Sequence, residues 1–456
     1  MHSKALILVQ FTFLAASLVL AAPTSPSSAV EPTATVPFAS TDPNFPLWDP
    51  ESDPSIPQPI RGSLGASILG PDNKFLDLQN PDLLAPPTTD HGTVGNAKWP
   101  FSLSKNRLQT GGWARQQNGK KYLILSAGQV IDSSTTVNVM PIAKNLAGVN
   151  MRLEAGAIRE LHWHRTSEWA YVIKGTTQIS AVDQDGKNFV ANVNPGDLWF
   201  FPAGIPHSLQ ATNDTEEGSE FLLVFPDGTF DEDDTFLLTD WLAHVPAEVI
   251  QKNFQVTDPK VFSHIPAEEL YIFPGTPPAN ADAPSDPQGT VPLPFFFPFS
   301  QVEPTKLGGG SVKIVDSRTF KISTTVAAAE VTVEPGALRE LHWHPTMDEW
   351  TFFLEGQARV TIFGGQSNAN TFNYQAGDVG YIPVSMGHFV ENTGNTTLKF
   401  LEVFNSDLFQ DVSLSQWLAL TPPELVKAHL GLDDAAIKEL TQFKEKAIVV
   451  PPLKKN

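Results

Sequence analysis

The chain has 456 residues, with 50 acidic and 30 basic side chains and a formal net charge of -20. Nucleic-acid binding needs concentrated positive charge, so this balance argues against a nucleic-acid partner. Its 31 glycines and 39 prolines, with only 18% charged residues, are typical of a β-rich globular protein with many turns and exclude a coiled coil or a disordered chain. The length allows two or three domains, each with its own core.

The N-terminus has the layout of a secretory signal. A lysine precedes an apolar run from Ala5 to Leu20, and small residues follow. We predict that residues 1–21 are a signal peptide, that 22–95 form a leader and N-terminal arm rich in Pro, Ser and Thr, and that the protein is secreted to the cell wall or beyond. A membrane anchor is the alternative, but the run is short. No other segment approaches about 20 continuous apolar residues, so we expect no membrane partner.

A long internal repeat follows. Three segments of the first copy return in the second: EAGAIRELHWH as EPGALRELHWH, NPGDLWFFPAGIPH as QAGDVGYIPVSMGH, and LTDWLAHVPAEVI as LSQWLALTPPELV. Each copy should therefore build the same domain. The stretch between them carries PGTPP, DAPSDPQG and GGG, which are typical of a linker. We predict an N-terminal domain over 96–271, a linker over 272–310 and a C-terminal domain over 311–456.

Within each copy the pattern is that of strands. YVIKGTTQISAV and TFFLEGQARVTIF are rich in β-branched and aromatic residues, and PGD and AGD are turn signals. Helical patterns occur near residues 239–252, 415–430 and 433–446. We predict an all-β protein of two tandem jelly-roll barrels, each with short C-terminal helices. The sequons at Asn213 and Asn395 fall at expected surface turns and are candidate glycan sites.

ELHWHRTSEW (160–169) and its repeat ELHWHPTMDEW (340–350) carry the main chemical signal. Residues two apart on a strand point to the same face, so both histidines of each His-Trp-His would aim into the barrel. A glutamate follows a short turn, and a third histidine comes from a distant strand. The chain has no cysteine, and three imidazoles with one carboxylate suit a divalent transition metal: zinc, manganese or iron. The predicted sets are His162, His164, Glu168 and His207, and His342, His344, Glu349 and His388.

A structural role must be weighed against this metal site, because a lone buried histidine is usually a satisfied core residue. Here six of the eleven histidines stand at matched positions in two copies, each time beside a matched glutamate. A structural explanation would require both barrels to bury the same costly polar cluster. Metal binding is therefore favoured. The remaining histidines do not belong to such a matched set: His2, His91, His244, His264 and His429.

These motifs resemble those of the cupin superfamily, and specifically of the bicupin oxalate decarboxylases. Two positions depart from the pattern: Ser385 stands where a glycine is expected, and Ala211 where an asparagine is expected. Both affect turns rather than ligands. The first cupin motif reads Gly156, His162, His164, Glu168 and Gly175, then Gly336, His342, His344, Glu349 and Gly356. The second reads Gly196, Pro202, Gly204 and His207, then Gly377, Pro383, His388 and Asn392.

The resemblance implies a substrate, a cofactor and an assembly. These are oxalate, two manganese ions per chain with dioxygen as a catalytic co-reactant, and a homo-oligomer of three or six subunits. An arginine three residues before the first histidine, Arg159 or Arg339, would bind the oxalate anion. On a regular strand Arg159 would face away from His162, so we expect a bulge or the start of a loop there. The tryptophans between the histidines resemble residues at subunit contacts, although core packing would explain them equally well.

The resemblance also implies a lid over the first site. The matching stretch is acidic, from Asp231 to Thr235, and Glu232 takes the position of the proton donor. In the second copy Glu402 matches a glutamate near the second metal, while its partner in the first copy is apolar. The two sites are therefore expected to be chemically unequal.

The function that follows is decarboxylation of oxalate to formate and carbon dioxide. The nearest alternative is an oxalate oxidase, which makes hydrogen peroxide when no competent lid acid supplies a proton. A dioxygenase acting on aromatic flavonols would need a larger apolar pocket and no clamping arginine. A storage protein without metal would typically have lost the ligands. Because the negative chain should repel the oxalate anion, we expect activity to peak below neutral pH.

Overall fold

The computed structural model describes residues 81–453, except positions 105, 120, 124, 127–128, 131–135 and 139. The predicted signal peptide and most of the leader lie outside these described residues. Within them, no helix is both long and apolar enough to cross a membrane.

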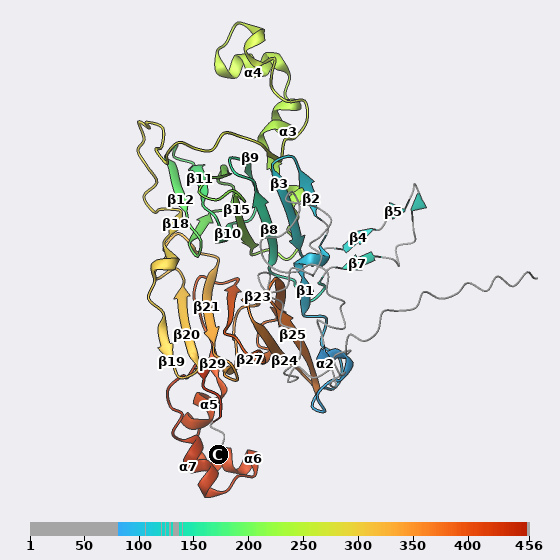
Figure 1. The fold of residues 1–456 in the computed structure, drawn as a ribbon, viewed down its shortest axis with the longest axis vertical. Helices are drawn as coiled ribbons and strands as arrows, with labels where there is room; N and C mark the ends of the chain where they lie inside the picture. Colours follow the sequence, from blue (N-terminus) through green and yellow to red (C-terminus); the bar gives the residue numbers. More distant parts are fainter. Residues whose placement is uncertain are drawn as a thin grey trace, which may run out of the picture. The chain divides into compact units, whose positions relative to one another are not determined.

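Each repeat forms a barrel of two antiparallel sheets, as predicted (Figure 1). Apolar side chains of both sheets fill the space between them, including Val149 and Leu209 in the first barrel. The larger sheet of the first barrel contains β18 (Phe296–Phe297), β13 (Leu198–Phe201), β10 (Glu168–Lys174), β15 (Ser219–Phe225), β8 (Ala147–Leu153), β3 (Gly112–Gln117) and β2 (Arg107–Gln109). The smaller contains β12 (Asn188–Val193), β11 (Thr177–Val182), β14 (His207–Ala211), β9 (Ile158–Trp163), β16 (Phe236–Leu237) and β17 (Ile272–Phe273).

The second barrel repeats this layout. Its larger sheet contains β1 (Lys98–Pro100), β26 (Asp378–Ile382), β23 (Glu349–Glu355), β28 (Leu398–Phe404), β21 (Ala327–Val333), β20 (Gly310–Val315) and β19 (Thr305–Leu307). Its smaller sheet contains β25 (Asn368–Gln375), β24 (Gln357–Gly365), β27 (Gly387–Asn392), β22 (Leu338–Trp343), β29 (Val412–Ser413) and β30 (Val449–Val450). Two small hairpins complete the strands: β4 (Lys121–Leu123) with β7 (Thr136–Asn138), and β5 (Leu125–Ser126) with β6 (Gln129–Val130).

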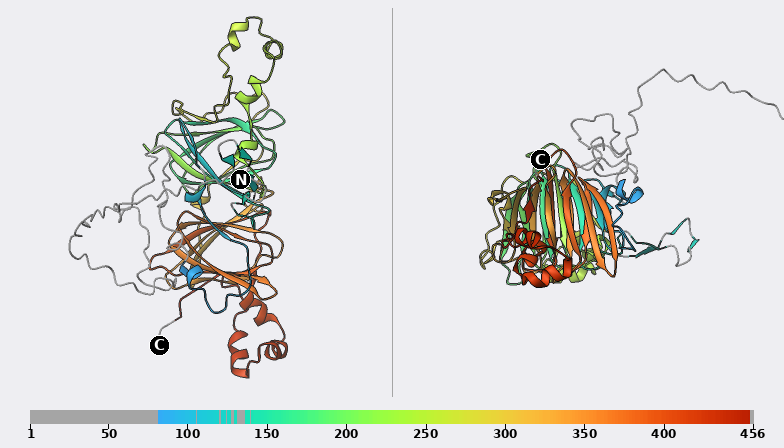
Figure 2. Two further views of the ribbon diagram at one scale, coloured as in Figure 1. Left: turned by 90° about the vertical axis from the view of Figure 1, so that its right-hand side faces the viewer. Right: turned by 90° about the horizontal axis from the view of Figure 1, so that it is seen from below.

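Short helices leave the two barrels, visible in all three ribbon views (Figure 1, Figure 2). Helices form near 239–252 and 415–430, where the sequence has helical patterns, and each stretch divides into two helices because a proline cannot donate the backbone hydrogen bond that continues a helix. Pro246 separates the first pair, and Pro422 separates α5 from α6. The helices are α2 (Pro81–Leu84), α3 (Leu238–Ala243), α4 (Ala247–Phe254), α5 (Leu414–Leu420), α6 (Pro423–Leu430) and α7 (Asp434–Leu440). Single 3-10 turns are η2 (Phe101–Leu103), η3 (Glu232–Asp234), η4 (Pro259–Phe262) and η5 (Phe299–Gln301).

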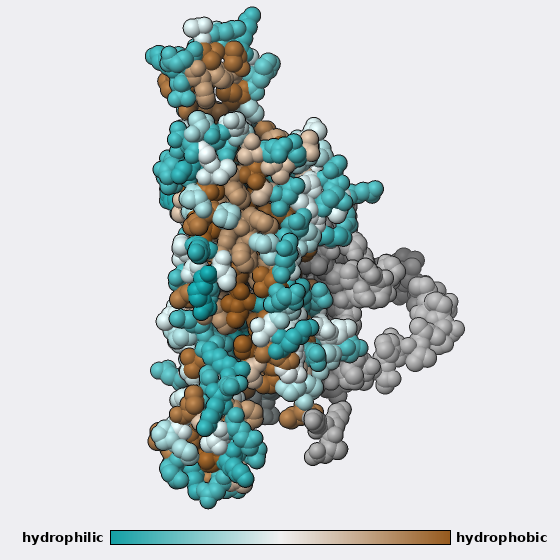
Figure 3. All heavy atoms as spheres, turned by 90° about the vertical axis from the view of Figure 1, so that its left-hand side faces the viewer, coloured by the Kyte–Doolittle hydropathy of each residue, from teal (hydrophilic) through white to brown (hydrophobic). Residues whose placement is uncertain are grey.

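The helices present large apolar side chains to solvent. The space-filling view shows such side chains over the helical ends and along the barrels (Figure 3). Trp241, Trp417 and Leu420 are more than half exposed. At the base of the helices, Trp163 packs edge-on against Trp241 with ring centroids 5.5 Å apart, and Trp343 packs against Trp417 at 5.6 Å. The two tryptophans of the His-Trp-His segments thus face away from the barrel interiors.

Strand pairing crosses the domain boundaries predicted from the sequence. Strand β1 precedes the first barrel in the chain but pairs with β26 of the second, where Lys98 and Asp378 form a buried ion pair of 2.9 Å. Strand β18 lies in the predicted linker but pairs with β13 of the first barrel. The expected linker, 272–310, therefore contributes strands to both barrels.

Contacts between the barrels join their larger sheets into one interface. Trp350 Nε1 donates to Gln117 Oε1 at 2.8 Å, and the Tyr171 hydroxyl donates to Glu330 Oε2 at 2.9 Å. The apolar cluster around them draws buried residues from both repeats, including Trp169 and Phe352.

Candidate active site

A bulge in β9 brings Arg159 to the same face as His162. In the pairing of β9 with β14, Arg159 lies opposite Leu209 and His162 lies opposite His207. The chain therefore moves three residues along β9 but only two along β14, which is the bulge. The extra residue, Leu161, points outward and is 52% exposed. The second barrel repeats this shift between β22 and β27. The bulge expected from strand parity is therefore present in both copies.

The structure brings together all eight predicted metal ligands, in two buried clusters. In each cluster the four candidate ligand atoms lie within 4.8 Å of one another. Glu168 Oε2 is 3.1 Å from His164 Nε2 and 3.6 Å from His207 Nε2. In the second cluster Glu349 Oε2 is 2.8 Å from His344 Nε2.

Backbone carbonyls determine which ring nitrogen of each histidine is available to a metal. The Nδ1 atom of His162 lies 2.6 Å from the Glu160 carbonyl oxygen, and Nδ1 of His207 lies 2.8 Å from that of Ile205. A carbonyl only accepts, so Nδ1 carries the proton and Nε2 presents a lone pair to the cluster. In the other four histidines of the two clusters, Nδ1 also lies close to a backbone carbonyl oxygen: His164 to Thr166, His342 to Glu340, His344 to Gln410 and His388 to Met386.

These tautomers indicate a cation. A carboxylate oxygen 3.1 Å from an imidazole lone pair is a repulsive contact unless a proton or a metal lies between them. Among the described residues, Nε2 of His207 and of His342 are buried without a hydrogen-bond partner. The donor set of three imidazoles and one carboxylate suits manganese, iron or zinc.

Electrostatics favour the metal-binding protonation state at several of the candidate ligands. Burial lowers the pKa of His162 well below its usual range, and the nearby Arg159 lowers it further, so the imidazole stays neutral. Burial alone would raise the pKa of the Glu168 carboxyl, but positive charge between it and His164 and His207, as protonated rings or a metal ion would supply, holds that pKa well below its usual range. Neutral imidazoles and an ionised carboxylate need release no proton before they bind a metal.

Different residues orient the ligand glutamate in the two barrels. Trp199 Nε1 donates to Glu168 Oε1 at 2.7 Å, whereas the Thr351 hydroxyl donates to Glu349 Oε1 at 2.5 Å. The two donors exchange places between the barrels. In the first barrel Trp199 lies opposite Ala170, and at the matching position of the second barrel Gly380 lies opposite Thr351. A Cβ at Gly380 would lie 3.3 Å from the Thr351 Cβ. Sequence reasoning missed both donors, although the Trp/Gly exchange is visible inside the matched PGDLWFF and AGDVGYI segments.

Beside the first cluster, Glu232 is buried between two side chains. Arg159 Nη2 donates to Glu232 Oε2 at 3.1 Å, and the Tyr271 hydroxyl donates to the same oxygen at 2.7 Å. Nε and Nη1 of Arg159 are buried without a hydrogen-bond partner among the described residues. They are thus free to donate to an anion. The structure therefore places the predicted arginine and lid glutamate in direct contact.

Tyr271 is a site residue that sequence reasoning missed. It adopts a φ of 56°, as does Ile448 at the matching place in the second barrel. Burial raises the pKa of its hydroxyl well above the usual range, and the Glu232 charge adds to this, so the hydroxyl remains a donor. The weak match of YIFP (271–274) with IVVP (448–451) was the available signal.

The walls near the first cluster are aromatic. The Phe225 and Phe230 rings stack with centroids 3.5 Å apart, and both lie edge-on to His164. Phe201 stacks on His207 at 4.2 Å. Aromatic rings therefore pack directly against two of the candidate ligands, His164 and His207.

The second site is charged differently. Arg339 Nε donates to Glu402 Oε1 at 3.1 Å, and its Nη2 donates to Asp411 Oδ2 at 2.9 Å, with all three side chains buried. Lys446 also pairs with Asp411. Burial raises the pKa of Glu402, and the Glu349 charge adds to this against the attraction of Arg339. The predicted Glu402 and Arg339 thus meet beside the second cluster, but the arginine already faces two carboxylates.

Comparisons with known proteins agree with this architecture. The cupin family matches residues 127–261 and 299–438. The oxalate decarboxylase of Bacillus subtilis is 52% identical over 379 residues, covering 83% of this chain and 93% of that protein. A probable oxalate decarboxylase of Arthroderma benhamiae is 39% identical over 394 residues, covering 85% of this chain and 92% of that protein.

A solved structure of the Bacillus subtilis enzyme, described for its Mn(II) centers, superposes with a TM-score of 0.76 at 51% identity. It covers 88% of this chain and 100% of that chain. The protein is therefore a member of the cupin family with two cupin domains, and within that family it belongs to the oxalate decarboxylases.

Proposed function

We propose that this protein decarboxylates oxalate to formate and carbon dioxide at the first site. The observation that carries the proposal is the buried contact of Glu232 with Arg159, beside a cluster that fits a divalent metal. Two of the Arg159 nitrogens remain free to bind an anion, and a glutamate in the same place can carry a proton. In the second barrel Arg339 contacts Glu402 and Asp411 instead, and among the described residues no glutamate of a lid segment contacts it, which supports catalysis at the first site.

The metal of this proposal is manganese. The ligands would be His162, His164, Glu168 and His207, with a second ion at the matching set of the C-terminal barrel. Bound manganese, together with dioxygen, would supply the one-electron chemistry that makes loss of carbon dioxide from oxalate accessible. The Mn(II) centers described for the Bacillus subtilis relative support this choice.

The protein's own residues handle charge and protons. Arg159 binds one oxalate carboxylate through its planar guanidinium. Glu232 accepts the proton of hydrogen oxalate, and after carbon dioxide leaves it returns that proton to the remaining carbon, giving formate. The reaction is balanced, because one hydrogen oxalate yields one formate and one carbon dioxide. Tyr271 holds the Glu232 carboxylate in place through its hydroxyl.

The second candidate function is an oxalate oxidase, which would share the metal site but release hydrogen peroxide. The buried position of Glu232 favours the decarboxylase, because a proton donor stands next to the substrate-binding arginine. Arg339 and Glu402 are proposed to support the second metal site, where no lid glutamate contacts the arginine.

Product analysis tests the proposal. Purified protein is given oxalate in mildly acidic, aerated buffer, and formate and hydrogen peroxide are measured together. We expect mostly formate, and we expect Glu232→Gln to lower formate production about 100-fold or more, since general acid–base catalysis contributes at least that much. Manganese content should not change. Asp240→Asn, an exposed acid on α3, serves as the control. Mostly peroxide from the native protein would identify an oxidase instead.

We further propose that the protein is secreted, glycosylated and oligomeric. Asn213 and Asn395 are both exposed in bends, where a glycan has room. The exposed apolar side chains of α3 to α7 provide surface for contacts between subunits of a trimer or hexamer.

A further inference from the structure

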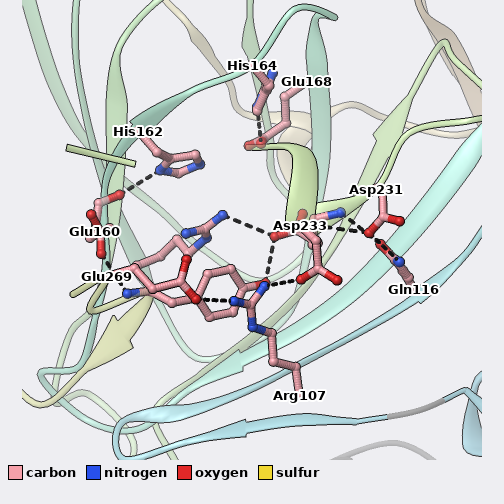
Figure 4. Close-up of polar contacts among 12 residues, drawn as sticks. Arg107, Gln116, Glu160, His162, His164, Glu168, Asp231, Asp233 and Glu269 are labelled. Atoms are coloured by element: carbon pink, nitrogen blue, oxygen red, sulfur yellow. Dashed lines mark hydrogen bonds and ion pairs between the residues drawn. The ribbon is translucent and has the colours of Figure 1, made fainter. Parts of the chain in front are cut away.

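The acidic segment Asp231–Thr235, called the lid segment below, is held by side chains from β2 and β3. Arg107 Nη1 pairs with Asp233 Oδ1 at 2.5 Å. Gln116 Nε2 donates to Asp231 Oδ1 at 2.8 Å, and its Oε1 accepts from the Glu232 backbone N–H at 2.9 Å. Figure 4 shows Arg107 between Asp233 and Glu269, with Gln116 beside Asp231.

Arg107 also contacts the second partner of Glu232. Its Cζ lies 3.8 Å from the centroid of the Tyr271 ring, and the Arg159 Cζ lies 4.0 Å from the same centroid. Nη2 of Arg107 pairs with Glu269 Oε1 at 2.5 Å, two residues before Tyr271. One guanidinium therefore holds both the lid segment and the tyrosine that donates to Glu232, without touching Glu232 through any contact described for it.

This arrangement belongs to the first barrel alone. Strands β2 and β19 occupy matching edges, and Thr305 takes the position of Arg107. Ile448 takes the position of Tyr271, and within the part of the chain that the structure describes no lid glutamate contacts Arg339. Arg107, Tyr271 and the lid glutamate thus occur together at the first site. If Arg107 only stabilised the surface, it would not need to occur together with the other two.

We propose that Arg107 is a positioning residue for the reaction. It holds the lid segment closed, so that Glu232 stays in place to return its proton before oxidation competes. The inference rests on the proposed function. The Arg107 side chain is 27% exposed and that of Asp233 is 74% exposed, so their ion pair is weak enough to open at each turnover. Stacking on Tyr271 adds a contact that the surrounding protein partly desolvates.

The ratio of peroxide to formate is the readout. We expect Arg107→Gln to raise this ratio about five- to tenfold. That factor corresponds to the combined free energy of one exposed ion pair and one cation–π contact. Asp233→Asn removes only the ion pair and should raise it about two- to fivefold. Arg107→Lys keeps the charge but loses the planar stacking, and should fall between the native protein and Arg107→Gln. The double variant Arg107→Gln/Asp233→Asn should match Arg107→Gln, because the two residues act as one pair.

Salt gives an independent readout. High chloride screens exposed ion pairs, so it should raise the ratio in the native protein and raise it less in Asp233→Asn, which keeps only the pair of Arg107 with Glu269. Arg359→Gln is the matched control, because Arg359 is 20% exposed and pairs with Glu391 on the second barrel. Manganese content and the unfolding temperature are measured for every variant.

The outcomes separate the two proposals. A native protein that makes no formate overturns the proposed function and this inference with it. Abundant formate from the native protein with an unchanged ratio in Arg107→Gln overturns the role of Arg107 alone. Should Arg107→Gln fold poorly, Asp233→Asn decides, because Asp233 is mostly exposed and its loss leaves the core intact.

Discussion

Arg159 and Arg339 occupy matching positions in the two barrels, yet they meet different charges. Both side chains are buried, but Arg159 contacts one carboxylate and keeps two nitrogens unpaired among the described residues, whereas Arg339 contacts two carboxylates and keeps one nitrogen unpaired. The first arginine therefore has capacity for an anion. The second is already compensated within the fold.

Replacing each arginine by glutamine should separate these roles. Arg339→Gln leaves Glu402 and Asp411 without the cation between them, and should lower the unfolding free energy by about 3–5 kcal/mol. Arg159→Gln should instead raise KM for oxalate about tenfold or more, since a charge-assisted hydrogen bond to the substrate is lost. Thermal unfolding and oxalate kinetics of both variants check this. Equal effects of the two changes on KM would contradict the assignment.

At the scale of elements, the site depends on how strands pair across long distances in the sequence. The bulges in β9 and β22 turn the arginine toward the histidines, and the exchanged strands β1 and β18 close the edges of the larger sheets. The buried Lys98–Asp378 ion pair anchors β1 to the second barrel. Burial lowers the pKa of Lys98, with Asp378 acting in the opposite direction.

Lys98→Met tests this anchor. Without the lysine charge, the Asp378 carboxylate stays buried, and the unfolding free energy should fall by about 3–5 kcal/mol. Lys427→Met breaks an exposed pair with Asp434 on the C-terminal helices and should change little. Denaturant unfolding followed by tryptophan fluorescence compares the two. A loss of similar size in both variants would show that β1 adds no particular stability.

The sequence predicts most of each candidate ligand cluster because the spacing within the His-Trp-His segment and its following glutamate is local, whereas His207 and His388 are found from the matched repeat. His162 and His164 are two apart on one strand, and Glu168 follows a short turn, so strand periodicity alone brings them together. Tyr271 and Trp199 could not be predicted in this way, because their positions depend on the register between distant strands. The segment 272–310 has the composition of a linker, but its backbone pairs with strands that the local sequence does not specify.

For the whole molecule, acid should remove stabilising carboxylates. Burial alone would raise the pKa of Asp411, but Arg339 and Lys446 outweigh it and hold the pKa below its ordinary value. Arg318 likewise outweighs burial at Asp316. A depressed pKa in the folded state means that the unfolded chain takes up the proton first as pH falls.

Stability should therefore fall in two stages as pH drops: first below about pH 6.5, where the unfolded chain protonates imidazoles such as His162 that stay neutral in the folded protein, and then below about pH 4, where the carboxylates are protonated. Asp411→Asn should be less stable than the native protein at neutral pH but lose less stability in acid. Urea unfolding at a series of pH values measures both curves. Parallel curves for the two proteins would show that Asp411 does not contribute to acid unfolding.

The exchanged strands have a consequence for the history of the chain. A single barrel cut out between residues 96 and 271 would carry β1 without its partner and would leave the edge of β13 bare. Bare edges invite pairing with other chains, so either half alone should aggregate rather than fold. The duplicated unit cannot easily be divided back into two independent proteins. Because the two barrels stabilise each other, the site of one barrel can change its chemistry while the other barrel maintains the fold. The different surroundings of Arg159 and Arg339 are consistent with such a divergence.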